Sequence, residues 1–128
     1  MKPVALGETA TMEIMPEPQH TAAAMGNVGV EVVGTPALIG YLELASHRAI
    51  RQACEEGEVT VGTRVEVDHL APAFLGAPVT AHAEVAAVEG RRITFRVEAR
   101  QGERLVMTGR HGRAVVALAR LLGRERKG

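Results

Sequence analysis

The sequence has little with which to build a disulfide or a metal centre, because its 128 residues include a single cysteine, Cys54. One cysteine excludes an intrachain disulfide and a cysteine-based zinc site. No pair of His, Asp or Glu residues has the spacing of a zinc or iron site. The sequence also lacks a GxSxG nucleophile elbow and a phosphate-binding glycine loop. We therefore expect no metal and no cofactor.

Aromatic residues are also scarce, at 2% of the chain. Base-stacking nucleic-acid binding needs aromatic platforms. Neither charge is in excess, because 15 Lys and Arg balance 15 Asp and Glu. A neutral chain has no general attraction to nucleic acid or to an anionic membrane. No apolar run reaches the roughly 18–20 residues of a membrane span, and the N-terminus lacks a signal-peptide core. We therefore expect a cytoplasmic protein that binds neither nucleic acid nor a membrane.

What the sequence does contain is typical of a globular protein. Hydrophobic residues make up 46% of the chain and charged residues 23%, and the length fits one domain over residues 1–128. Residues 15–34 are rich in proline and glycine and predict a long loop, of the kind that often forms a lid. The basic tail, residues 120–128, is expected to fray.

Residues 35–54 carry the clearest helical pattern. Thr35 is the expected N-cap, and Pro36 suits the first helical position because its missing N–H has no partner there. Gly57 supplies a stop signal. Apolar residues recur at three- and four-residue spacing along this segment, which predicts a helix buried deeply in the fold. They are Leu38, Leu42, Ala45, Ala49 and Ala53, widened by Ile39, Ser46 and Ile50.

The remaining segments alternate with a period of two and predict strands. These are residues 8–14, 59–69, 79–88, 93–99 and 104–119. In 59–69 the odd-numbered residues form the apolar face. Short turns at Glu89-Gly90 and Gln101-Gly102 predict antiparallel hairpins. One helix among five strands predicts an α+β hot-dog fold, in which a curved antiparallel sheet wraps around one long central helix. The exposed edge strand predicts a homodimer, with a higher oligomer as the alternative.

Three polar residues stand where polarity has a cost. Glu43 borders the apolar side of the helix, His69 ends an apolar strand face, and Thr35 begins the helix. Each also has a simpler reading: a solvated Glu, a His bonded to a backbone group, and a capping Thr. Together, a carboxylate, an imidazole and a hydroxyl suit hydrolysis. Sequence spacing alone does not show that they converge.

From about residue 7 to 119, the chain resembles the fluoroacetyl-CoA thioesterase-like family of the hot-dog superfamily. Three stretches carry the resemblance: GTPALIGYLELASHRAI (34–50), TVGTRVEVDHLAPAFLG (60–76) and VEGRRITFRVEARQGERLVMTGRHGRAVV (88–116). The family has a Thr before the helix, a Glu eight residues later and a His on the next strand. Thr35, Glu43 and His69 fall on these positions.

The resemblance implies hydrolysis of an acyl-CoA thioester. Glu43 would attack the carbonyl or activate water, His69 would assist proton transfer, and Thr35 would orient Glu43 or the acyl group. The resemblance also implies substrate-binding roles for Gly62, through its backbone, and for Arg113. The family's lid carries a phenylalanine, whereas residues 20–33 here contain no aromatic. A short- or medium-chain acyl-CoA is therefore the expected substrate. The alternative is a non-catalytic hot-dog module that binds an acyl-CoA or another ligand.

Overall fold

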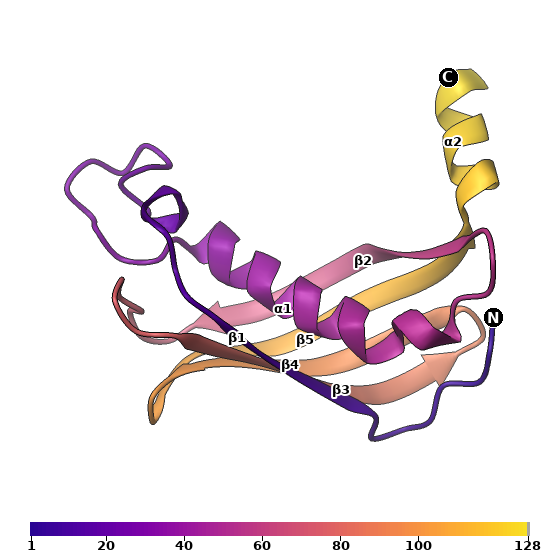
Figure 1. Ribbon diagram of the computed structural model, residues 1–128, viewed down its shortest axis with the longest axis horizontal. Helices are drawn as coiled ribbons and strands as arrows, with labels where there is room; N and C mark the ends of the chain where they lie inside the picture. Colours follow the sequence, from indigo (N-terminus) through magenta and orange to yellow (C-terminus); the bar gives the residue numbers. More distant parts are fainter. Residues whose placement is uncertain (128) are drawn as a thin grey trace.

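The structure, a computed structural model, describes residues 1–127, and the side chains of residues 1–123. One long helix lies along one face of an antiparallel sheet, and a second helix projects from the body at the C-terminus (Figure 1). The elements in chain order are β1 (Thr9–Ile14), η1 (Pro18–His20), α1 (Thr35–Ile50), η2 (Arg51–Ala53), β2 (Glu58–His69), β3 (Val79–Glu89), β4 (Arg92–Gln101), β5 (Arg104–Ala117) and α2 (Leu118–Lys127).

The sheet has five strands in the order β1-β3-β4-β5-β2, and every neighbouring pair is antiparallel. The sheet curves around α1, which confirms the predicted hot-dog fold. Strand β2 lies at one edge of the sheet and β1 at the other. The hairpins β3–β4 and β4–β5 turn where the sequence predicted, at Gly90 and Gly102, which both have positive φ.

The core lies between α1 and the sheet. The buried side of α1 includes Leu38, Leu42 and Ala45, which pack against inward residues of β3 and β4 such as Phe95. Alternate residues of β3 are fully buried alanines and valines, whose small side chains let the helix approach closely. The other side of α1 is open, and Leu44 there is 52% exposed. The expectation of a deeply buried helix therefore holds for one side only.

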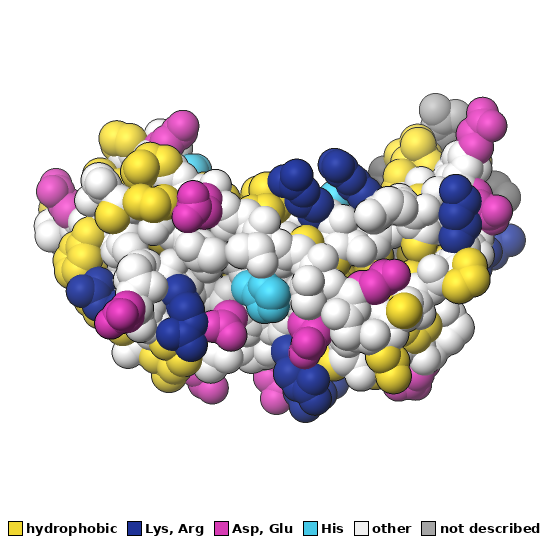
Figure 2. All heavy atoms as spheres, turned by 60° about the horizontal axis from the view of Figure 1, so that its bottom comes forward, with side chains coloured by type: hydrophobic (Ala, Val, Ile, Leu, Met, Phe, Trp, Pro, Cys, Tyr) yellow, Lys and Arg dark blue, Asp and Glu magenta, His cyan; other side chains and the backbone are white. Residues whose placement is uncertain are grey.

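The outward side of the sheet is polar. Arg96 forms an ion pair with Glu84, and Arg100 forms one with Glu98. Acidic and basic side chains are interspersed over the face in Figure 2 rather than gathered into one large patch of a single sign. Exposed ion pairs of this kind contribute little to stability. Because this side is solvated, the side that faces α1 is the one that carries the core and the candidate site.

The prediction that the odd-numbered residues of 59–69 share one apolar face was wrong. The β2–β5 register shifts between Gly62 and Arg64, at a β-bulge. A bulge inserts one extra residue and so changes which residues face each side of the sheet. Before it, Thr60 and Gly62 pair with buried residues of β5, and after it His69 pairs with buried Met107. The bulge thus brings even-numbered and odd-numbered residues of β2 to the same side.

Two further expectations need correction at element ends. Gly34, not Thr35, is the N-cap of α1, and Thr35 is its first residue, without a side-chain capping bond. The last strand ends at Ala117 rather than at 119, because the chain turns into the helix α2. Most of the tail, residues 120–127, lies in this helix, and residue 128 lies outside the described residues; fraying of the tail stays a prediction.

Candidate active site

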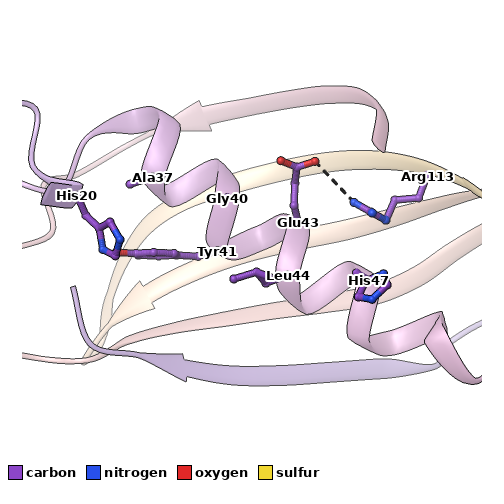
Figure 3. Close-up of a pocket in the computed structure, with 8 residues that line it drawn as sticks. All are labelled: His20, Ala37, Gly40, Tyr41, Glu43, Leu44, His47 and Arg113. Atoms are coloured by element: carbon purple, nitrogen blue, oxygen red, sulfur yellow. Dashed lines mark hydrogen bonds and ion pairs between the residues drawn. The ribbon is translucent and has the colours of Figure 1, made fainter. Parts of the chain in front are cut away.

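A cleft of about 500 Å³ runs along the open side of α1. One wall comes from the helix, one end from the loop that precedes it, and the other end from β5 (Figure 3). Three of its side chains, Glu43, His47 and Arg113, are ionisable groups at one end, and His20 and Tyr41 lie at the other. The lining is completed by Ala37, Gly40 and Leu44. The cleft therefore combines apolar walls with convergent polar groups, as ligand sites do.

Glu43 is the carboxylate of this cleft. Its side chain is 42% exposed, with Oε2 3.6 Å from Arg113 Nη1 and 3.8 Å from His111 Nε2. Figure 3 shows the carboxylate pointing toward Arg113. Gly62 lies next to it, since a Cβ on Gly62 would come within 2.7 Å of Glu43 Oε2. Glu43 and two of the predicted residues, Gly62 and Arg113, are therefore together in space.

Arg113 is buried and is held in the sheet. Its Nε donates to Thr60 Oγ1 at 2.9 Å, and its Nη2 donates to the Thr60 carbonyl at 3.0 Å. Its Nη1 lies 3.2 Å from His111 Nε2 and faces Glu43. A guanidinium anchored in this way cannot extend to a distant phosphate. Any contact that Arg113 makes with substrate is therefore through Nη1, beside the Glu43 carboxylate.

Two histidines of this cluster are partly or fully removed from water. Burial lowers the pKa of His111, and the Arg113 charge lowers it further, while the bond to the Arg64 carbonyl and the Glu43 charge oppose this. Burial also lowers the pKa of His47, with smaller contributions from Arg113 and Arg51. The His47 ring accepts or donates at Thr60 Oγ1, 2.7 Å away. Both rings are therefore neutral at pH 7.

The lowered pKa values predict that the protein loses stability in mild acid. Between the lowered folded pKa and the unfolded value of about 6.5, the unfolded chain binds protons that the folded chain does not. The free energy of unfolding therefore falls as pH drops below about 6.5. Urea unfolding at several pH values should show this slope, and a His47→Gln/His111→Gln double variant should flatten it. Parallel slopes in the parent and the double variant would contradict the assignment.

Thr35 and His69 form a second group. Thr35 Oγ1 and His69 Nδ1 are 2.7 Å apart, at the start of α1 and the end of β2. His69 lines a different cavity, of about 310 Å³, with Leu70 and Pro72. The hydroxyl that was expected to cap the helix therefore bonds the imidazole instead.

The two groups do not meet in the structure of this chain. Thr35 and Glu43 are eight residues apart on α1, which corresponds to about 12 Å along a helix axis. Within the part of the chain that the structure describes, no hydrogen bond or ion pair joins Glu43 to Thr35 or His69. The structure thus places Gly62 and Arg113 beside Glu43, in the middle of α1, and His69 beside Thr35, at the start of α1.

Sequence reasoning missed several residues of the cleft. Thr60 and His111 hold Arg113. Thr60 did not stand out because the predicted alternation put it on the even-numbered, polar face of its strand, and no pattern in the sequence singled out His111. Tyr41 and His20 close the other end, where the Tyr41 hydroxyl lies 2.8 Å from His20 Nδ1. The presence of a lone buried Tyr in an aromatic-poor chain is the signal that singles out Tyr41.

Gly62→Ala is predicted to keep the fold and lower turnover. The new Cβ would come within 2.7 Å of Glu43 Oε2, which is the far end of a flexible side chain and can move. Displacing a reacting group by about 1 Å can lower the rate by roughly 100-fold. We expect kcat to fall by about 10–100-fold, with the melting temperature within a few degrees of the parent. Thermal melts and steady-state rates check this, and an unchanged kcat would contradict the placement of Gly62.

Among the described residues, no group of three or more His, Cys, Asp or Glu side chains is arranged to hold a metal ion. No helix in residues 1–127 is long and apolar enough to cross a membrane. The cleft and its immediate surroundings present a half-exposed carboxylate, a guanidinium beside it, and neutral imidazoles.

Comparison with known proteins finds relatives that are thioesterases. The family model for fluoroacetyl-CoA-specific thioesterases matches residues 17–119. The fluoroacetyl-CoA thioesterase of Streptantibioticus cattleyicolor is 38% identical over 97 residues, which cover 76% of this chain and 70% of that protein. A solved structure of the fluoroacetyl-CoA thioesterase FlK superposes with a TM-score of 0.92 at 31% identity, covering 98% of both chains. A thioesterase superfamily member from Thermus thermophilus has a TM-score of 0.91 at 32% identity, covering 99% of this chain and 94% of that one.

Proposed function

Because this chain belongs to the fluoroacetyl-CoA-specific thioesterase family, we propose that it hydrolyses a short- or medium-chain acyl-CoA to the free acid and CoA. The observation that carries the proposal is the Glu43 carboxylate, set in the cleft beside Gly62 and Arg113. The relatives are thioesterases, so the activity is that of an acyl-CoA thioesterase rather than of a non-catalytic binding module.

The proposed roles follow from where the side chains lie. Glu43 attacks the thioester carbonyl or activates the water that does, and both routes add one water and release the acid and the thiol. Arg113 Nη1, beside the carboxylate, and the Gly62 backbone bind the substrate and stabilise charge on the carbonyl oxygen. His69 assists proton transfer, and Thr35 orients it through their hydrogen bond.

We propose that the loop over residues 15–34 is the lid of this site. Its flanks are tied by the Thr21–Val33 bridge and by the bond from Ala22 N to Val32 O, while Val28 at its tip is 92% exposed. The tip carries no aromatic, so nothing on it favours a fluoroacetyl group over other acyl groups. Hydrogen exchange at the tip should be fast and should slow when an acyl-CoA binds. Unchanged exchange would argue against a lid.

We propose that the working unit is a homodimer paired through the β2 edge. Strand β2 has an unpaired edge, and Val65 near its middle is 43% exposed. Antiparallel pairing centred between Val65 and Glu66 sets Gly62 opposite His69 of the partner subunit. Each site then combines Glu43 from one protomer with the Thr35–His69 pair of the other. A cytoplasmic location, where acyl-CoA is made and used, fits this activity.

Release of free CoA from a panel of thioesters tests the function. The panel runs from acetyl-CoA and fluoroacetyl-CoA to octanoyl-CoA, with the thiol followed by a chromogenic disulfide. We expect steady turnover with the short and medium chains and no strong preference for fluoroacetyl-CoA over acetyl-CoA. Saturable binding of every thioester without turnover would overturn the proposal in favour of the binding module. A large preference for fluoroacetyl-CoA would overturn the substrate class alone.

A further inference from the structure

His111 lies on β5 next to Glu43 and Arg113, and the proposed function gives it no role. Its side chain is 2% exposed and stacks on Phe95, with ring centroids 6.5 Å apart. Its Nδ1 lies 2.8 Å from the Arg64 carbonyl oxygen. A carbonyl only accepts, so Nδ1 carries the hydrogen of that bond. The ring is thus fixed in one tautomer by the strand that bears the bulge.

With Nδ1 protonated, the Nε2 of a neutral ring carries a lone pair and can only accept a hydrogen bond. Arg113 Nη1 lies 3.2 Å from this Nε2, and a guanidinium only donates. The direction of the bond is therefore fixed: Nη1 donates and His111 accepts. Burial keeps His111 neutral, and so keeps this acceptor available. The other two nitrogens of Arg113 are held by Thr60, so His111 holds the one that faces Glu43.

We propose that His111 is a positioning residue, which uses its unprotonated Nε2 to hold Arg113 Nη1 toward the Glu43 carboxylate. Nη1 lies close to both groups, 3.2 Å from His111 Nε2 and 3.6 Å from Glu43 Oε2, and these two atoms are 3.8 Å from each other. Without this acceptor the planar guanidinium is free to pivot about the line through Nε and Nη2, the two atoms that Thr60 holds, and the pivot carries Nη1 away from Glu43. The proposal rests on the proposed function for its effect on turnover, but not for its effect on Arg113.

Two substitutions separate the two bonds of His111. Gln places its carbonyl near the position of Nε2, so His111→Gln keeps an acceptor for Arg113 and loses the bond to the Arg64 carbonyl. Asn places its amide near the position of Nδ1, so His111→Asn keeps that bond and loses the acceptor. We expect kcat to fall by about 10–100-fold in His111→Asn, with KM within about threefold, and much less in His111→Gln. The half-buried His82, which lies outside the cleft and bonds Thr11, supplies a control in His82→Gln with unchanged rates.

Nitrogen NMR supplies a readout that needs no turnover. The parent should show the Nδ1–H tautomer at His111 and slow rotation of the Arg113 guanidinium, and slow rotation should persist in His111→Gln but be lost in His111→Asn. An Nε2–H tautomer in the parent would overturn the proposal. Full activity in His111→Asn together with loss of activity in His111→Gln would also overturn the proposal. That result would mean that His111 acts through its bond to the Arg64 carbonyl, which joins β5 to β2. A parent with no thioesterase activity would defeat the proposed function, and the NMR result would still decide the inference.

Discussion

Glu43→Gln is expected to lower kcat for acyl-CoA hydrolysis by about 10²–10⁴-fold, the range for a positioned acid–base group. Gln keeps the volume of the side chain but neither attacks the carbonyl nor takes a proton from water. Glu43 is half-exposed at the mouth of the cleft, and an amide is easier to desolvate than a carboxylate. The fold should therefore survive, with a melting temperature close to that of the parent.

The matched control is Glu84→Gln. Glu84 is a carboxylate on the outward side of β3 whose side chain is 40% exposed, close to the 42% of Glu43; it pairs with Arg96 and lies outside the cleft. Thiol release should be unchanged in this variant. Turnover of Glu43→Gln at the parent rate, in a folded protein, would remove Glu43 from the reaction. Hydrolysis in ¹⁸O-labelled water under single-turnover conditions then separates the two routes, because only nucleophilic attack leaves the label in the Glu43 carboxylate.

Mixing two inactive variants is expected to restore activity. Glu43→Gln and His69→Ala homodimers each lack one group at both sites. If Glu43 and His69 of one site come from different protomers, a mixed dimer has one intact site and one doubly altered site. Random exchange makes about half of the dimers mixed, so the mixture should recover roughly a quarter of the parent activity. Activity is measured after unfolding and refolding the two variants together.

The contrary outcome is equally clear. If each site used Glu43 and His69 of a single protomer, every site in the mixed dimer would lack one group, and activity would stay at the level of the separate variants. Refolding each variant alone controls for recovery. A molecular mass of 13.6 kDa by light scattering, that of a single chain, would contradict the dimer itself.

The sequence predicted the elements well because their signals are local. The helix beginning at Thr35 and the hairpins at Gly90 and Gly102 follow from periodicity and turn residues, and the structure confirms them. Glu43 stood out because a carboxylate at the border of an apolar stripe has a desolvation cost. Its neighbour Gly62 was reached through the family resemblance and not through any pattern of its own.

The parts of the candidate site that the sequence did not predict depend on contacts between residues that are distant in the sequence. The Thr60–Arg113 contact spans 53 positions, and the bulge that brings Thr60 and His69 to the same side of the sheet has no counterpart in a period-two pattern. Thr35 illustrates the opposite error, because its position at a helix start suggested a cap although its hydroxyl bonds His69. A local rule predicts that a side chain bonds the nearest backbone group, whereas the folded chain brings the imidazole of His69 to the Thr35 hydroxyl.

The bulge in β2 also constrains how this chain can change in length. Between Thr60 and His69 we expect the strand to accept substitutions at its outward positions, since those side chains face solvent. Deleting or inserting one residue there is different, because a one-residue slip turns every later side chain to the opposite side of a sheet. Loss of the extra residue would face either Gly62 or His69 away from α1. Activity should therefore depend on the seven-residue spacing between Gly62 and His69, and we expect single-residue insertions or deletions between them to be more damaging than point mutations.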